Sequence, residues 1–462
     1  MPLPPDPVAA VGGIAAFGRR LRRGDMTAES ATRAYLERIA LLDGKLQAYE
    51  HVFTEEALAA ARSVDALLAA GTDLGPLMGV AVGVKDIIAV AGAPTHAGSV
   101  IDVTDRTGEE GSFVQRLRRA GCIIVGKTRT VEFALGALGT NAVRGTPIMP
   151  WDAVIARAPG GSSSGSAVAM AAGLCAFAIG TDTGGSVRGP AAFCGTFGLK
   201  TTVGLWPLDG IFPLSPTLDS IGPLTRTAAD AAVVFAALTD RPPPAALSLR
   251  GLRLGKPIHP FYDDMDADVA RNMAAALTAL EEAGATIVEV DVPEADEANR
   301  LFGVMVAAEL IAVLGRERFL AERHRMDPGV AERAAIGLDL KATDWIAARW
   351  RHDALRRIAG ERMAGFDGWI APTRQMVAPV LAGGLDADAQ RRLASDIPRN
   401  TRVINMFGQC AAAIPLHGLG AALPTSLQAI CPGGADRHLL ALSLAIEASI
   451  GEAPAPGLEG FL

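Results

Sequence analysis

The 462-residue sequence contains few cysteines, few histidines and no excess of basic charge. Its 5 cysteines are odd in number and form no C-x-x-C pair, which excludes a disulfide framework and indicates a reducing compartment. The 43 Lys and Arg residues are outnumbered by 50 Asp and Glu residues, so no basic field is available to hold nucleic-acid phosphates. We therefore expect no nucleic-acid partner.

The sequence also lacks a continuous apolar run that could span a membrane. Two long uncharged stretches, 158–181 and 403–435, are interrupted, the first by GGSSSGS and the second by three prolines. A membrane-spanning helix needs about 20 apolar residues in succession. The N-terminal MPLPPDPVAA has neither the basic region nor the apolar region of a signal peptide. We expect a soluble, cytoplasmic protein with no membrane partner.

Patterns typical of helices alternate with patterns typical of strands along the chain. Capping residues and apolar spacing predict helices at 54–71, 112–120 and 269–283. Apolar runs at 79–84, 122–125 and 176–179 are typical of central strands buried on both faces, whereas the alternation in 286–292 predicts a strand exposed on one face. The sequence therefore predicts an α/β fold, with helices on both sides of a largely buried sheet.

The number of domains depends on the proline-rich segment RPPPAALSLR at 241–250. Its prolines exclude regular structure, so it either separates two lobes or crosses the surface of one domain. We favour the surface crossover, because strand-like runs at 369–371 and 426–430 could complete the same sheet. The expected organisation is one domain over 1–462, with 1–25 as an N-terminal segment.

The most informative segment is rich in glycine and serine and covers residues 158–202. Two small-residue loops, 160–164 and 183–186, are separated by a predicted helix at 165–174 and the buried strand at 176–179. In the second loop, Thr-Gly-Gly-Ser, successive backbone N–H groups can converge on one point, because glycine tolerates unusual dihedral angles. Such an arrangement binds developing negative charge. Flexible linkers do not lead directly into core elements, so these loops indicate a site.

A serine nucleophile in these loops needs a base. No histidine lies in the segment, and the seven histidines have diverse surroundings. Lys85 is the other candidate, because it follows the apolar run 79–84 and burial lowers the pKa of lysine. A neutral lysine at pH 7 requires a pKa decrease of about 3.4 units, or roughly 4.6 kcal/mol. A catalytic Lys85 must therefore be deeply buried.

These motifs, taken in order, resemble the amidase signature family. The Gly/Ser signature is present as GGSSSGS, GTDTGGSVR and PAAFCGTFGLK, and GVAVGVKD at 79–86 resembles the lysine strand of that family. The resemblance is strong over 25–240 and looser over 366–450. It implies a single large mixed β-sheet sandwiched between helices, and it favours one domain.

The resemblance also assigns roles to individual residues. It implies that Ser186 is the nucleophile, that Lys85 is the base, and that Ser162, next to a cis peptide bond, relays the proton between them. It implies an oxyanion hole from the backbone N–H groups of Thr183, Gly184, Gly185 and Ser186. The supporting positions are Ser163, Asp182 and Arg188. No metal or organic cofactor is expected.

The implied function is hydrolysis of a small-molecule carboxamide to a carboxylate and ammonia or an amine through a seryl acyl-enzyme. The alternative is the glutaminase-type component of a tRNA-dependent amidotransferase, which works with a partner protein. The turn at Gly204 leads into Leu-Trp-Pro rather than an arginine-containing glycine turn, and this favours a free-standing amidase. The sequence is also compatible with a homodimer. Three departures from the family pattern, Arg129, Ile148 and Met149, could reshape the substrate pocket.

Two short patterns suggest other classes of protein. Residues 121–128 match the P-loop expression of NTPases, but CIIV at 122–125 is typical of a buried strand rather than a phosphate loop. Residues 161–165 match G-x-S-x-G, but the preceding Ala-Arg-Ala-Pro is a poor candidate for the strand that a nucleophile elbow requires. A binding protein without catalysis is a further alternative, and the presence of Lys85, Ser162 and Ser186 argues against it.

Overall fold

An 11-stranded mixed sheet runs through the molecule, with the strand order β1-β3-β2-β4-β6-β5-β10-β11-β9-β7-β8. The computed structural model describes residues 2–381, 393 and 395–462. The strands are β1 Tyr49–Val52, β2 Ala81–Lys85, β3 Ile123–Thr128, β4 Phe177–Thr181, β5 Phe197–Lys200, β6 Ile221–Thr225, β7 Arg253–Pro257, β8 Thr286–Val290, β9 Gly368–Pro372, β10 Cys410–Pro415 and β11 Ser426–Cys431.

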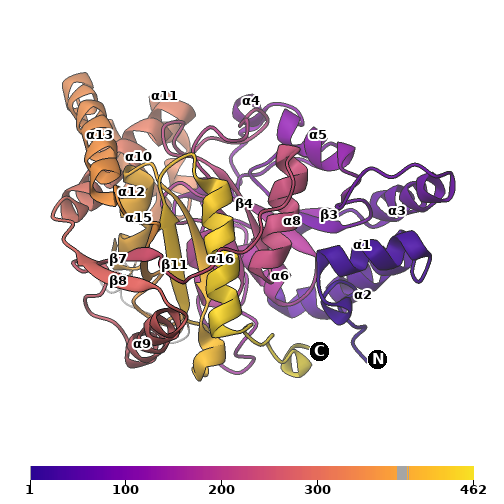
Figure 1. The fold of residues 1–462 in the computed structure, drawn as a ribbon. Coiled ribbons are helices and arrows are strands. Elements are labelled where there is room, and N and C mark those ends of the chain that lie inside the picture. The colour runs from indigo at the N-terminus through magenta and orange to yellow at the C-terminus, as the bar shows by residue number, and fades with distance from the viewer. Residues whose placement is uncertain (1, 382–392, 394) are drawn as a thin grey trace.

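Helices cover both sides of this sheet, as Figure 1 shows, which confirms the predicted α/β sandwich. Helices α8 and α16 pack on each other and on β6 and β10, and α6 and α7 pack on β4 and β5. The helices are α1 Ile14–Arg23, α2 Ala28–Leu46, α3 Thr54–Ala69, α4 Thr104–Thr107, α5 Ser112–Arg119, α6 Ser164–Ala171, α7 Arg188–Cys194, α8 Ala228–Thr239, α9 Ala267–Glu282, α10 Ala295–Leu314, α11 Arg316–Glu322, α12 Pro328–Ala335, α13 Ala342–Met363, α15 Arg399–Met406 and α16 Asp436–Ile450.

The three strands predicted to be central lie side by side in the sheet. β3, β2 and β4 are parallel neighbours, and all of their residues are buried. Parallel strands covered on both faces need such continuous apolar runs. The alternating segment forms β8, which is the outermost strand beside β7, so its exposed residues face solvent at the edge of the sheet.

Strands from both sides of the proline-rich segment 241–250 belong to the same sheet. The segment has no helix or strand and connects α8 to β7, and the N–H of Leu247 donates to the carbonyl of Ala441 on α16 at 3.1 Å. One domain over 1–462 stays a prediction. In the N-terminal segment 1–25, α1 packs on α8, and the N–H of Ile14 donates to Asp230 Oδ1 at 2.7 Å.

Candidate active site

The predicted catalytic residues lie on three segments that meet at one edge of the sheet. Lys85 is the last residue of β2, Ser162 and Ser163 immediately precede α6, and Ser186 lies in the loop between β4 and α7. Because β2 and β4 are parallel neighbours, their carboxyl ends share this edge. Ligand sites of α/β sheets are found at such carboxyl ends.

Lys85 forms hydrogen bonds inside this cluster and is completely buried. Its Nζ donates to Ser162 Oγ at 2.8 Å and to Thr181 Oγ1 at 2.9 Å. Burial lowers the pKa of Lys85 to about 7, although the negative charges of Asp219 and Asp182 act in the opposite direction. A large fraction of Lys85 is therefore neutral at neutral pH, as a general base requires.

The main chain holds Ser162 in place beside this lysine. The Gly161–Ser162 peptide bond is cis, as the family resemblance implies. The carbonyl of Ser162 accepts hydrogen bonds from Thr130 Oγ1 at 3.0 Å and from the N–H of Val131 at 3.2 Å. These two donors anchor the main chain of the residue, so the hydroxyl of Ser162 stays within reach of the amine.

Ser186 is the most accessible of the three predicted catalytic residues. Its exposed fraction is 8%, whereas Lys85 and Ser162 are fully buried. The carbonyl of Ser186 accepts the N–H of Ser163 at 3.1 Å, which ties the two small-residue loops together. Among the three predicted catalytic residues, Ser186 is therefore the one with surface left for a substrate to contact.

The two glycines before Ser186 are required by close contacts. A Cβ atom on Gly184 would lie 2.4 Å from the ring of Phe302, and a Cβ atom on Gly185 would lie 2.1 Å from Thr401 Oγ1. Gly185 also has a φ of 115°, which L-residues rarely adopt. The glycines thus allow the loop to pack directly against α10 and α15.

The backbone amides of this loop differ in what they bind. The Gly185 N–H donates to Asp182 Oδ1 at 2.8 Å, so it is committed to holding the loop. The N–H groups of Thr183, Gly184 and Ser186 have no acceptor in the part of the chain that the structure describes. These three amides, rather than the Gly185 amide, are available to bind an anionic oxygen.

Asp182 and Arg188 support the loop as a buried ion pair. Their closest atoms are 3.0 Å apart, and both side chains are fully buried. Asp182 also accepts from the N–H of Val187 at 3.2 Å and from Asn405 Nδ2 at 2.9 Å. Burial opposes the charge on Asp182, but the attraction and hydrogen bonds of Arg188 outweigh it and hold the pKa of Asp182 well below its usual range.

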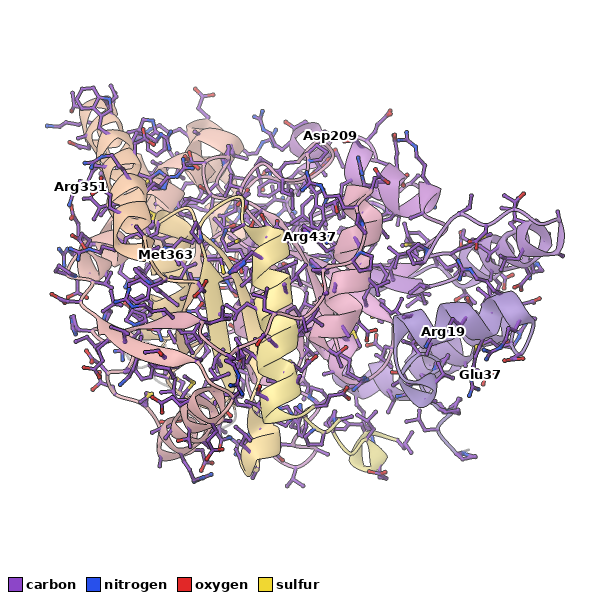
Figure 2. The ribbon with its side chains drawn as sticks, in the orientation of Figure 1. Arg19, Glu37, Asp209, Arg351, Met363 and Arg437 are labelled. Atoms are coloured by element: carbon purple, nitrogen blue, oxygen red, sulfur yellow. The ribbon has the colours of Figure 1, made fainter. Side chains whose placement is uncertain are left out.

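Replacing Arg188 by methionine is expected to lower the free energy of unfolding by about 3–5 kcal/mol, because Asp182 would keep a buried charge without its partner. Urea denaturation measures the effect. The matched control is Arg351→Met, which removes an arginine of α13 that pairs with Glu297 near the outer edge of the molecule (Figure 2). The side chains of this pair are 40% and 37% exposed, and a solvent-accessible pair contributes at most about 1 kcal/mol. Equal losses in both variants would contradict the structural role of Arg188.

Several polar residues of the site were not predicted from the sequence. Thr181 Oγ1 accepts the second hydrogen bond of Lys85 Nζ. The backbone N–H of Thr181 donates to Ser163 Oγ, and Ser163 Oγ donates to the carbonyl of Thr181, both at 3.3 Å. Its position at the end of a buried strand is the only signal in the sequence. Thr401 and Asn405 of α15 come from the region of looser resemblance and carry no local signal.

Two of the three departures from the family pattern, Arg129 and Ile148, contact the C-terminal end of α2, and the carbonyl of Arg129 also accepts the N–H of Gly165 at 3.0 Å. Arg129 donates to Gln47 Oε1 at 2.8 Å and to the carbonyl of Tyr49 at 3.2 Å. The N–H of Ile148 donates to the carbonyl of Leu46 at 2.9 Å, and Met149 is fully buried. Their predicted effect on the substrate pocket stays a prediction.

The two short patterns of other protein classes do not have the structures they require. Gly126, Lys127 and Thr128 belong to the buried strand β3, which extends three residues beyond its predicted end. Lys127 Nζ pairs with Asp86 Oδ1 at 2.7 Å instead of lining a phosphate loop. Residues 151–160, which precede Gly161, form no strand, and Arg157 makes only an isolated bridge.

The described residues contain no metal-binding cluster, and their two buried histidines contact groups other than the predicted catalytic residues. No group of three or more His, Cys, Asp or Glu residues with metal-binding geometry occurs among them. The buried histidines His352 and His417 both have a lowered pKa because of burial. His352 contacts Arg349 and His417 contacts the carbonyl of Pro454, away from the predicted catalytic residues.

Comparison with known proteins places the chain in one family. The sequence profile of the family Amidase matches residues 30–440. The chain is 40% identical to 2-amino-5-chloromuconic acid deaminase of Comamonas testosteroni, over 96% of this chain and 97% of that protein. It is 34% identical to the A subunit of the glutamyl-tRNA(Gln) amidotransferase of Salinispora arenicola, over 94% and 96% of the two chains.

Solved structures show the same fold. The crystal structure of an amidase superposes with a TM-score of 0.86 at 29% identity, covering 95% of this chain and all of that chain. The peptide amidase of Stenotrophomonas maltophilia superposes with a TM-score of 0.80 at 27% identity, covering 98% of this chain and all of that chain. The chain therefore belongs to the amidase family and is a hydrolase that acts on carbon–nitrogen amide bonds.

Within the described residues, no single helix is both long enough and apolar enough to cross a membrane. Helix α10 passes such a test only together with the helical segment that follows it, Arg316–Arg325, and the two are bent by 88°.

Proposed function

We propose that this amidase hydrolyses a small carboxamide to a carboxylate and ammonia or an amine through an acyl-enzyme on Ser186. The observation that carries the proposal is the 2.8 Å hydrogen bond from Lys85 Nζ to Ser162 Oγ in a fully buried site. A neutral amine in this position can act as the base for a serine.

In the first half of the reaction, Lys85 accepts the proton of Ser162 while Ser162 accepts the proton of Ser186. The Oγ atom of Ser186 forms a bond to the amide carbonyl carbon, and the carbonyl oxygen becomes an oxyanion. The amides of Thr183, Gly184 and Ser186 stabilise that oxygen. The relay then returns the proton to the leaving nitrogen, the carbon–nitrogen bond breaks, and ammonia or an amine departs.

In the second half, water takes the place of the leaving group. The same relay removes a proton from water, whose oxygen bonds to the acyl carbon, and the proton returns to Ser186 Oγ as the ester bond breaks. The relative named a deaminase supports ammonia as the leaving group. Every proton in this cycle is carried by Lys85, Ser162 and Ser186, so the chemistry is balanced with protein groups and water.

The alternative is a component of an amidotransferase, which the similarity to the Salinispora protein supports. We expect the purified chain alone to hydrolyse simple carboxamides faster than it hydrolyses glutamine. Ammonia release from aliphatic, aromatic and ureido amides and from glutamine, measured side by side, tests this. Turnover that is confined to glutamine, or that requires a partner protein, would contradict the free-standing amidase.

We also propose a cytoplasmic location, in line with the five free and buried cysteines. A homodimer stays a prediction, and light scattering of the purified protein measures it. Cell fractionation tests the location.

A further inference from the structure

Asp219 is a buried carboxylate that is bonded directly to the loop before Ser186. It lies just ahead of β6 and has an exposed fraction of 5%. Its Oδ1 accepts the hydroxyl of Thr183 at 2.5 Å, and its Oδ2 accepts the backbone N–H groups of Leu214 and Ser215, both at 3.0 Å. Each carboxylate oxygen therefore holds a different segment.

The main chain keeps the two segments together. The N–H of Asp182 donates to the carbonyl of Ser220 at 2.8 Å, and the N–H of Ser220 donates back to the carbonyl of Asp182 at 3.2 Å. This reciprocal pair places the residues Thr183 and Asp219 beside each other. The position of Thr183, and with it the free amide that begins the loop, thus depends on Asp219.

The charges around Lys85 set Asp219 apart from its neighbour Asp182. Both carboxylates act on Lys85, but Asp182 is paired with Arg188 at 3.0 Å and also interacts with Lys200. Across the described residues, no ion pair involves Asp219. Asp219 is therefore the carboxylate whose charge is not already balanced by a guanidinium.

A second buried carboxylate, Glu309 of α10, contacts the segment 214–217 that Asp219 also binds. It accepts hydrogen bonds from the hydroxyls of Ser215 and Thr217. Burial, assisted by the charge of Glu309, raises the pKa of Asp219 to about 6. Asp219 is still mostly ionised at pH 7 and above, where Lys85 is neutral enough to act as a base.

We propose that Asp219 is a positioning residue for amide hydrolysis, which fixes the oxyanion loop through Thr183 and stabilises the ammonium that forms on Lys85 when Ser186 attacks. The proposal rests on the proposed function. A negative charge near an amine favours its protonated form, and in enzyme that starts the reaction with neutral Lys85 this form arises as Ser186 attacks. Asp219 thus helps the chemical step without touching the substrate.

The test compares Asp219→Asn with Glu309→Gln in the pH dependence of kcat/KM. Both variants remove one buried carboxylate bonded to the loop 214–217, but only Asp219 acts on Lys85. In Asp219→Asn we expect the rise of kcat/KM with pH to move to lower pH by about one unit. The plateau of kcat should fall at least about tenfold, with little change in KM. In Glu309→Gln the rise should stay at the wild-type pH.

Equal shifts in both variants, or no shift in Asp219→Asn, would overturn the electrostatic part of the proposal. Thr183→Val provides an independent test that keeps the charge of Asp219 but removes the hydrogen bond. We expect a lower kcat with the pH dependence unchanged, and a wild-type kcat would overturn the positioning part. Failure of the proposed function is distinguishable, because it would appear as activity that survives the loss of Ser186.

Discussion

Replacing Ser186 by alanine is expected to lower kcat/KM for every carboxamide substrate by at least about 10⁴-fold, because the acyl-enzyme forms on its hydroxyl. Ser186 is the more accessible of the two serines, whereas Ser162 is fully buried and its hydroxyl accepts a hydrogen bond from Lys85. Ammonia release at substrate concentrations well below KM measures the loss. Mass spectrometry of the wild-type protein, quenched during turnover, should find the acyl group on the peptide that contains Ser186.

The matched control for this variant is Ser164→Ala. Ser164 is a serine of the other small-residue loop and begins α6. Its side chain is fully buried, and its hydroxyl has no hydrogen-bond partner among the described residues. Removing that hydroxyl should leave both stability and turnover close to the wild type. Wild-type turnover in Ser186→Ala would end the nucleophile assignment. An equal loss in both variants would indicate damage to the packing of the loops instead.

The second large effect concerns Lys85. We expect kcat/KM to rise with pH through a midpoint near 7 and to level off above it, because the base must be neutral and burial lowers the pKa of Lys85 to about 7. Lys85→Met should lower kcat/KM by about 10³-fold or more and abolish this rise. An amide with rate-limiting chemistry, as shown by a solvent isotope effect, is the substrate for the measurement.

Lys200 provides the control for the pH dependence. It is also fully buried, and burial lowers its pKa to about 8, but its Nζ donates to the carbonyls of Thr201 and Gln409 instead of a serine hydroxyl. In Lys200→Met the midpoint near pH 7 should therefore remain. A midpoint that disappears with Lys200, or a wild-type profile that is flat from pH 6 to 9, would contradict the assignment of Lys85 as the base.

Lys85→Met should also stabilise the folded protein, which separates lost catalysis from lost structure. Below the pKa of the unfolded state, lysine is charged in the unfolded chain but resists charging in the buried site. This difference costs stability at neutral pH, and methionine avoids it. The urea midpoint of the variant should rise while its activity falls, and a lower midpoint with lost activity would point to misfolding.

Much of the fold was predictable because its signals are local. The buried strands β2, β3 and β4 follow from continuous apolar runs, and α3, α5 and α9 follow from helical spacing and caps. The predicted end of β3 was wrong by three residues. Gly126, Lys127 and Thr128 look polar and flexible in the sequence, but pairing with β1 and β2 draws them into the sheet.

The site was predictable only in part. Lys85, Ser162 and Ser186 stand in ordered motifs, so the resemblance to a family could identify them. The Asp182 side chain decides which amide of the loop is free, because it accepts a hydrogen bond from the N–H of Gly185. Such a choice is made by hydrogen bonds in three dimensions and leaves no pattern in the sequence.

The sequence by itself determined the chemistry that is available: small-residue loops around a serine, a lysine at the end of an apolar strand, and low histidine and cysteine counts that are consistent with a site that needs neither. The tertiary structure decided how that chemistry is tuned. Burial lowers the pKa of Lys85 and Arg188 neutralises Asp182. Of the two carboxylates that act on Lys85, Asp219 is the one that forms no ion pair among the described residues. The reason is physical, because the energy of a charge depends on the water and partner charges around it, and only folding sets those.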